Sequence, residues 1–305
     1  MSKKPLLICV VGATAIGKTT LSIALAKAFD TEIISADSRQ FYSSMNIGTA
    51  VPSTQELAAA PHHFIQHKSI FDTYSVGDFE REALLKLDTL FSEKSTAILV
   101  GGSGLYVDAV VNGLDHFPDI EKEIRETLNT QLDNNGLQLL QQELMRVDPL
   151  YFKTMDTENP RRVIRALEIY RATGKPYSSF LNVKSANRNF KTLYIGLSAE
   201  RPIVYERINK RVDIMLENGL LEEVKKLYPH RDLNALQTVA YRELFQYFDG
   251  TLSLEKAVEE IKKNTRRFAK RQGTWFRKNQ HIHWFDYTTN SEAIIEFIKE
   301  KNAQN

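Results

Sequence analysis

Short apolar runs alternate with longer amphipathic stretches along most of the chain. Runs typical of strands cover residues 6–11, 32–36, 97–100, 192–197 and 281–285. The first run is continuously apolar, as expected of a parallel strand that is buried on both faces. Helical periodicity covers residues 18–29, 76–94, 104–111, 201–227 and 253–278. Because strands and helices alternate, the pattern predicts an α/β fold, with a mostly parallel sheet and helices on both of its faces.

The pattern changes between residues 116 and 185. Strand signals vanish there, and helical periodicity dominates at 120–132, 136–146 and 160–173. The last of these stretches ends at Gly174-Lys175-Pro176, which is a helix-terminating signal. The sequence therefore predicts a small α-helical insertion domain at 116–185, within a catalytic core made of residues 1–115 and 186–305.

The strand predicted at 6–11 leads into a glycine loop. The loop G-A-T-A-I-G-K-T, residues 12–19, matches the phosphate-loop pattern G-x-x-x-x-G-K-[ST], in the required context of a buried strand and a helix. The fold is therefore expected to be P-loop NTPase-like. Free N–H groups at the helix start would face an anion, Lys18 would add a positive charge, and the Thr19 hydroxyl would ligate Mg²⁺. A plain glycine turn is the alternative.

Asp37 stands directly after the strand predicted at residues 32–36. An ATPase usually carries its metal-binding aspartate at the end of a strand deeper in the sheet. Here the strand at 97–100 runs instead into the glycine cluster Gly101-Gly102-Ser103-Gly104. We therefore expect Asp37 to act as a base toward an incoming nucleophile, with a helix cap or turn as the alternative. The glycine cluster lies where open α/β sheets bind ligands, or it forms a simple tight turn.

Basic residues gather in two segments, although the net charge is only +2. Residues 261–280 hold eight Lys or Arg and no acid, and residues 160–171 hold four arginines and one glutamate. In the first segment Lys263, Arg267 and Lys270 share one helical stripe. Such a stripe with interleaved aromatic residues suits the backbone and bases of a nucleic acid. An ordinary amphipathic surface helix is the alternative.

Three arginines mark the start of the helix predicted at 201–227. Arg207 and Arg211 are spaced i,i+4 and share a face, and Arg201 precedes them. Two guanidinium groups on one face suit a pyrophosphate or a phosphodiester. A solvated basic face paired with neighbouring glutamates is the alternative.

The composition bears on where in the cell the protein is located. Cys9 is the single cysteine, which rules out a disulfide within the chain and favours a cytoplasmic location. No apolar run approaches the ~20 residues of a membrane helix. The apolar run after the basic start is short and leads straight into the glycine loop, so we interpret it as a strand and not as a signal peptide. A monomer without membrane contact is expected.

Taken together, these stretches resemble tRNA dimethylallyltransferases, also called tRNA isopentenyltransferases, nearly end to end. GATAIGKTTLSIALA resembles the phosphate loop of that family, and DSRQFYSSMNIGTAVPS, from Asp37 onward, resembles its longest motif. Further counterparts are HHF, YSVGDF, GGSGLYVDAVVNGL, NPRRVIRALEIYRATGKP and TRRFAKRQGTWFRK. The chain departs from the family at Ala240, where glycine is common, and at Ala13 and Ile16, where GPTASGK is common. Neither departure removes a proposed catalytic group.

The resemblance implies an activity. The family transfers a dimethylallyl group from dimethylallyl diphosphate to N6 of the adenosine just 3′ of the anticodon, in tRNAs that read codons beginning with U. Pyrophosphate leaves. The implied cofactor is Mg²⁺, and the implied partner is the anticodon stem-loop of tRNA. Because N6 is out of reach in a stacked base, we expect a flipped adenosine in a channel through the domain.

The resemblance also implies roles for particular residues. Asp37 is the implied general base on the adenine amine, Lys18 and Thr19 act at the diphosphate, and Arg207 with Arg201 clamps the departing pyrophosphate. The implied diphosphate loop comprises Gly12, Ala13, Thr14, Ala15, Ile16, Gly17, Lys18 and Thr19. The implied tRNA contacts are Asp37, Ser38, Arg39, Gln40, Ser103, Arg125, Arg161, Arg162, Val163, Ile164 and Arg165. The stripe of Lys263, Arg267 and Lys270 is expected to hold the RNA from outside.

Three other functions fit parts of the sequence. A small-molecule kinase with a phosphate loop explains that loop and Asp37 equally well, but not the basic segments or the string at 37–52. An isopentenyltransferase that acts on free adenine nucleotide needs neither the helical insertion nor the basic tail. An RNA-binding NTPase switch does not need Asp37 as a base.

Overall fold

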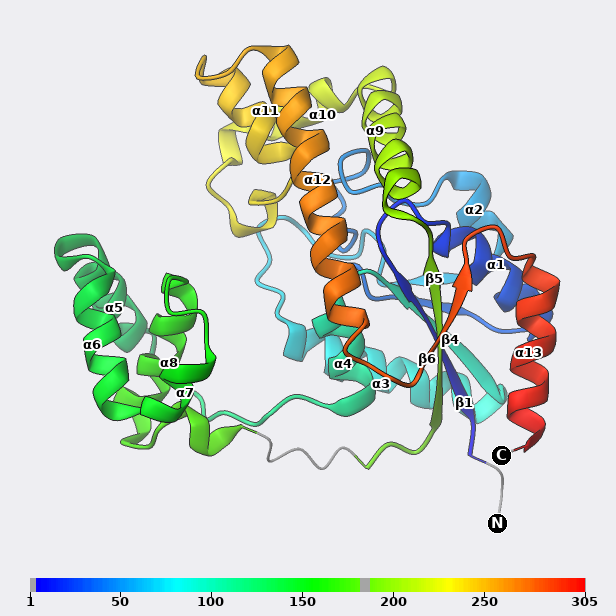
Figure 1. Cartoon of the computed structure of the whole chain (residues 1–305), viewed down its shortest axis with the longest axis horizontal. Coiled ribbons are helices and arrows are strands. Elements are labelled where there is room, and N and C mark those ends of the chain that lie inside the picture. The colour runs from blue at the N-terminus through cyan, green and yellow to red at the C-terminus, as the bar shows by residue number, and fades with distance from the viewer. Residues whose placement is uncertain (1–3, 182–186, 305) are drawn as a thin grey trace. The chain divides into compact units, whose positions relative to one another are not determined.

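A single parallel sheet organises the larger part of the molecule. The computed structural model describes residues 4–181 and 187–304. The six strands are β1 (Leu6–Gly12), β2 (Ile33–Ser35), β3 (His62–His63), β4 (Thr96–Gly101), β5 (Lys191–Ser198) and β6 (Ile282–Asp286). They lie in the order β3-β2-β4-β1-β5-β6, and every pair is parallel; Figure 1 labels β1, β4, β5 and β6. The predicted sheet is confirmed. Of these strands only the two-residue β3 was not predicted, because so short a run gives no hydrophobic pattern.

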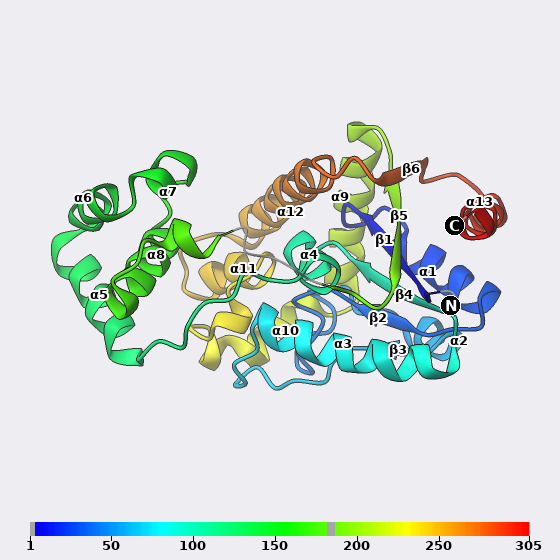
Figure 2. The ribbon, with the colours of Figure 1, turned by 90° about the horizontal axis from the view of Figure 1, so that it is seen from below.

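The sheet is buried from both sides, as its apolar runs predicted. All seven residues of the central strand β1 are buried, and their side chains alternate between two cores. Leu7 and Val11 belong to the core that also contains Phe79 of α3, whereas Ile8 belongs to the core that contains Leu25 of α1. Helices therefore cover both faces of the sheet, seen from a second side in Figure 2.

The helices of this larger unit follow the strands in α/β order. They are α1 (Lys18–Ala28), α2 (Thr54–Ala59), α3 (Val76–Glu93), α4 (Gly104–Asn112), α9 (Arg201–Glu217), α10 (Leu220–Leu227), α11 (Tyr241–Phe248), α12 (Leu254–Phe276) and α13 (Ser291–Gln304), with short 3₁₀ helices at Tyr228–His230 and Asn234–Leu236. The sequence pattern predicted α1, α3, α4 and α12 to within a few residues. It did not predict α2, α11 or α13.

The long helix predicted at 201–227 is wrong in one respect, because it is two helices. α9 ends at Glu217 and α10 begins at Leu220. Between them Gly219 takes a left-handed conformation with φ +95°, which terminates a helix and which glycine adopts without a steric penalty. Glu223 therefore lies on a separate helix, α10, and not on a continuation of α9.

The second compact unit lies within residues 112–181 and is helical. It contains α5 (Lys122–Asn135), α6 (Leu137–Val147), α7 (Pro149–Thr154), α8 (Pro160–Thr173) and a 3₁₀ helix at Tyr177–Phe180. Its own core is formed by residues of α5, α6 and α8, including Leu128, Leu144 and Leu167. Neither unit contains a helix, among the described residues, that is long and apolar enough to cross a bilayer.

Candidate active site

The phosphate loop connects β1 to α1 and depends on its glycines. Gly12 has φ +143°, and a Cβ there would lie 2.6 Å from the carbonyl oxygen of Leu197. Gly17, with φ +108°, stands directly before α1, and no side chain caps the start of that helix. Between the glycines Ala15 also has a positive φ, of 62°. The loop thus takes a conformation that leaves the N–H groups of the helix start for an anion.

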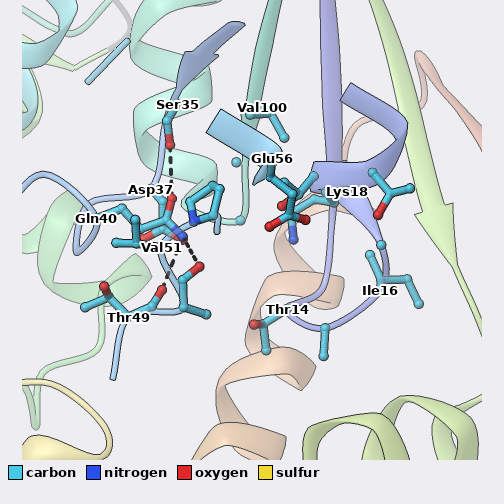
Figure 3. A pocket seen from close by; sticks show the side chains of 18 of the residues that line it. Thr14, Ile16, Lys18, Ser35, Asp37, Gln40, Thr49, Val51, Glu56 and Val100 are labelled. Carbon is cyan, nitrogen blue, oxygen red and sulfur yellow. Dashed lines mark hydrogen bonds between the residues drawn. The ribbon is translucent and has the colours of Figure 1, made fainter. Parts of the chain in front are cut away.

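The loop forms one side of a cavity of about 300 Å³, which we call the donor cavity. Its lining residues include Thr14, Ala15, Ile16, Gly17, Lys18 and Thr19 from the loop, and Asp37, Gln40, Thr49 and Ala50 from the opposite side. Figure 3 shows Lys18 and Asp37 facing this cavity from opposite sides. The loop and the end of β2 meet here because parallel strands bring their carboxyl ends to one edge of the sheet.

The side chain of Lys18 reaches back across the phosphate loop. Its Nζ donates a hydrogen bond to the carbonyl oxygen of Ala13, at 2.7 Å. Burial lowers the pKa of Lys18 to about 8, against the charge of Asp37, which raises it, while Arg211 lowers it further. An anion in the donor cavity would favour the charged form of this lysine.

Asp37 follows β2 and sits between two cavities. It lines the donor cavity and also a second cavity of about 330 Å³, which we call the acceptor cavity. Burial raises the pKa of Asp37, although the N–H of Arg39 donates to Oδ1 at 3.1 Å and the charge of Lys18 favours the ionised form. A carboxylate with a raised pKa is a stronger base than an exposed one. Asp37 can therefore reach a group in either cavity.

The acceptor cavity is lined by segments that are far apart in the sequence. Ser38, Arg39 and Ser103 line it near Asp37, and Phe268 and Arg271 line it from α12. The two serine hydroxyls lie 3.3 Å apart. An aromatic ring, hydroxyl groups and guanidinium groups around one opening suit a planar, polar ligand such as a nucleobase.

Side chains hold the wall segment, residues 45–52, which closes the donor cavity opposite the phosphate loop. Gln40 donates from Nε2 to the carbonyl oxygens of Thr49 and Ala50, at 3.2 and 2.9 Å (Figure 3). On the other side the carboxylate of Glu223 accepts hydrogen bonds from three consecutive N–H groups, at 2.7 to 3.1 Å, and from the Tyr241 hydroxyl at 2.6 Å. Sequence reasoning missed Glu223, because nothing near it in the chain marks a glutamate that binds a distant loop.

Two arginines of α9 reach the phosphate loop. Arg207 donates from Nε to the carbonyl oxygen of Ala15 at 2.7 Å, and both Arg207 and Arg211 line the donor cavity. Burial lowers the pKa of Arg211, and the like charge of Arg207 adds to that effect. Arg201 lines a different cavity, together with Lys270. The difference follows from helical spacing, since Arg207 and Arg211 share a face and Arg201 points elsewhere.

The Thr19 hydroxyl fits the Mg²⁺ ligand that the loop motif predicts. It lines the donor cavity, and Nε2 of His62, another lining residue, is buried with no hydrogen-bond partner among the described residues. No group of three or more acidic, histidine or cysteine side chains suited to hold a metal occurs among these residues. A few oxygen ligands are what Mg²⁺ requires when phosphate groups and water complete its shell.

The proposed RNA contacts on α12 differ in their surroundings. Lys263 is paired with Glu260 at 2.8 Å, and Arg267 lies 3.4 Å from the amide oxygen of Asn264. Lys270 lines the same cavity as Arg201. Their contact with RNA stays a prediction.

In the helical unit the six proposed RNA contacts fall into three pairs with different surroundings. Arg161 and Arg162 are exposed, and Arg125 and Arg165 both contact the buried carboxylate of Glu168, at 3.7 and 2.8 Å. The other two proposed residues, Val163 and Ile164, are 0% and 4% exposed in the unit's core. Their side chains pack against protein, because they occupy the apolar face of α8, so a direct contact of these two side chains with RNA is corrected to a packing role.

Comparisons with known proteins agree with the motifs. Residues 40–279 match the family described as IPP transferase. The chain is 60% identical to the tRNA dimethylallyltransferase of Christiangramia forsetii over 97% of this chain and 98% of that protein, and 58% identical to that of Flavobacterium psychrophilum over the same shares.

Solved structures agree as well. The fold matches the tRNA isopentenylpyrophosphate transferase of Bacillus halodurans with a TM-score of 0.74 and 38% identity, over 99% of this chain and 98% of that one. It matches a eukaryotic dimethylallyltransferase acting on tRNA with a TM-score of 0.81 and 27% identity, over 97% and 80%. The family match spans most of the chain, and the resemblance predicted from the motifs is confirmed. The chain therefore belongs to the tRNA dimethylallyltransferase family.

Proposed function

We propose that the chain transfers the dimethylallyl group of dimethylallyl diphosphate to N6 of the adenosine 3′-adjacent to the anticodon, in tRNAs that read codons beginning with U. The single observation that carries this proposal is the position of Asp37. It lies where the donor cavity, lined by the phosphate loop, meets the acceptor cavity. A base at that junction can act on a nucleophile while the electrophile is held on the other side. The names of the relatives support a dimethylallyl group as the group transferred and tRNA as the acceptor, and dimethylallyl diphosphate as the donor is part of the proposal.

The donor side neutralises a leaving group. In the reaction the bond between C1 of the allyl group and the diphosphate oxygen breaks, and the diphosphate leaves with the electron pair. Lys18, Arg207 and Arg211 line the cavity where this negative charge would grow. Charges and N–H groups that are already in place cost no reorganisation during the reaction. Mg²⁺, held by Thr19 and the diphosphate, would supply further charge stabilisation.

The acceptor side orients a weak nucleophile. The lone pair of the adenine amine forms the new bond to C1, and a proton of N6 passes to the carboxylate of Asp37. The raised pKa of Asp37 suits this transfer. The adenine must leave its stack to reach Asp37, and the ring of Phe268 and the guanidinium of Arg271 offer it a lining on α12. We expect the protein to work as a cytoplasmic monomer on the anticodon stem-loop.

The decisive experiment determines which labelled donor transfers its group to tRNA. Unmodified tRNA is incubated with labelled dimethylallyl diphosphate and, in parallel, with γ-labelled ATP, and the nucleosides are then separated by mass. We expect the five-carbon group on one adenosine beside the anticodon, and no label from ATP. Transfer from ATP alone would overturn the proposal in favour of a kinase.

A second experiment addresses an enzyme that acts on free adenine nucleotide. Charge reversal of Lys263, Arg267 and Lys270 together should weaken tRNA binding and reduce its dependence on salt, because fewer phosphates are neutralised. An enzyme for free nucleotide would keep its full activity.

A further inference from the structure

Gln272 bridges two loops from the C-terminal part of α12. Its side chain is 6% exposed. Oε1 accepts the N–H of Thr14 at 2.9 Å, and Nε2 donates to the carbonyl oxygen of Gly102 at 3.0 Å. Thr14 belongs to the phosphate loop, Gly102 follows β4, and both line the donor cavity. One buried amide therefore joins two walls of that cavity.

Two glycines after β4 allow α12 to pack closely against that segment. A Cβ at Gly102 would lie 2.2 Å from Nε2 of Gln272, and a Cβ at Gly104 would lie 2.2 Å from the ring of Trp275. Neither glycine has a positive φ, so close approach, not backbone conformation, requires them. Trp275 also donates from Nε1 to Asp108 at 2.9 Å. The glycine cluster after β4 is thus where α12 packs against the sheet edge.

The same helix forms part of the acceptor cavity. Thr265, Phe268 and Arg271 line that cavity, and Gln272 is the next residue along. A single rigid element therefore contacts the phosphate loop with one side chain and faces the acceptor cavity with others. The bond from Gln272 fixes the first half of the loop, while the N–H groups at the start of α1 remain for the ligand.

We propose that Gln272 is a positioning residue that holds the phosphate loop in its diphosphate-binding shape and ties it to α12. This inference rests on the proposed function, because it assumes that the loop binds the diphosphate of the donor. Gln272 itself does not line the donor cavity. Its contribution is preorganisation, since a loop that is held before binding loses less freedom when the ligand arrives.

The test measures binding of inorganic pyrophosphate with Mg²⁺ to the full chain by titration calorimetry. Gln272→Met keeps the length of the side chain and removes both hydrogen bonds. We expect pyrophosphate affinity to fall about five- to tenfold, the loss that one or two neutral hydrogen bonds produce. KM for dimethylallyl diphosphate should rise by the same factor, while kcat changes less than about twofold and tRNA affinity is unchanged.

Trp275→Phe is the matched control. It removes one hydrogen bond from the same face of α12 but does not touch the phosphate loop, so pyrophosphate affinity should stay at the wild-type value. Gly102→Ala, which displaces the amide without removing it, should reproduce the loss even if Gln272→Met folds poorly. Wild-type affinity in both Gln272→Met and Gly102→Ala, or an equal loss in Trp275→Phe, would overturn the inference. A wild-type chain that binds no pyrophosphate would instead contradict the proposed donor site.

Discussion

The phosphate loop and the wall segment at 45–52 face each other across the donor cavity, and they keep their shapes by different means. The loop is shaped mainly by backbone conformation, with positive φ angles at Gly12, Ala15 and Gly17, and single hydrogen bonds to Gln272 and from Arg207 hold it in place. The wall segment is held by side chains from outside it, namely Gln40 and Glu223. The positive φ angles of the loop can be inferred from its own glycines, whereas the bonds between Glu223 and the wall segment cannot be inferred from the sequence of either. Substitutions on the two sides should therefore have different effects.

The largest effect is expected at Asp37, which lies between the two sides. Asp37→Asn should lower kcat about a hundredfold or more, in keeping with loss of a general base, and leave Mg²⁺–pyrophosphate affinity within a few-fold of wild type. Single-turnover rates and calorimetry measure the two quantities separately. In the wild type kcat should rise with pH through a pKa above the ordinary aspartate value of about 3.9, because burial raises it. An unchanged pH profile in the variant would show that another group is the base.

The second effect concerns the wall segment. Glu223→Gln removes the charge that accepts three N–H groups and turns an amide donor toward them. We expect the free energy of unfolding to fall by about 2–3 kcal/mol, typical of hydrogen bonds to a charged group that are lost in a partly buried place. Urea denaturation measures this change. Glu222→Gln, an exposed neighbour on α10, is the control and should change stability by less than about 0.5 kcal/mol.

The third effect belongs to the phosphate loop and concerns pH. Since the pKa of Lys18 is lowered to about 8, the free enzyme holds a charged lysine below pH 8 and a neutral one above it. Pyrophosphate favours the charged form, so its affinity should be flat below pH 8 and fall as pH rises further, by at most about tenfold per pH unit. Calorimetry between pH 7 and 10 follows this change. In Lys18→Met the fall around pH 8 should disappear, and its persistence would assign the titration to another group.

The same contrast explains what the sequence could predict. The strands, the loop at 12–19 and Asp37 at a strand end were predictable, because periodicity and the glycine motif are local signals. The position of Asp37 between two cavities was not, since it depends on how α12 and the wall segment pack. Gln272 and Glu223 were missed for the same reason, as each bonds to a backbone far away in the sequence. Val163 and Ile164 were assigned to RNA by their place in a motif, although their apolar character indicated a core.

The smallest effect is expected at Ala240, where the chain departs from the glycine that is common in the resembled family. Ala240 has φ +79° and ψ −47°, a conformation that a residue with a Cβ rarely adopts. Its N–H donates a hydrogen bond to the carboxylate of Glu243 at 2.9 Å, which holds it in this conformation. The next residue, Tyr241, donates from its hydroxyl to Glu223. Ala240→Gly should relieve this strain and raise the free energy of unfolding by about 1 kcal/mol, less the extra freedom that glycine gains in the unfolded chain. Ala257→Gly, a buried position inside α12, should lower it, which separates relief of strain from a general effect of glycine. If Ala240→Gly also lowers stability, fixing the backbone before Tyr241 stabilises the protein by more than the strain at Ala240 costs. The wall segment would then depend on Ala240 as it does on Glu223.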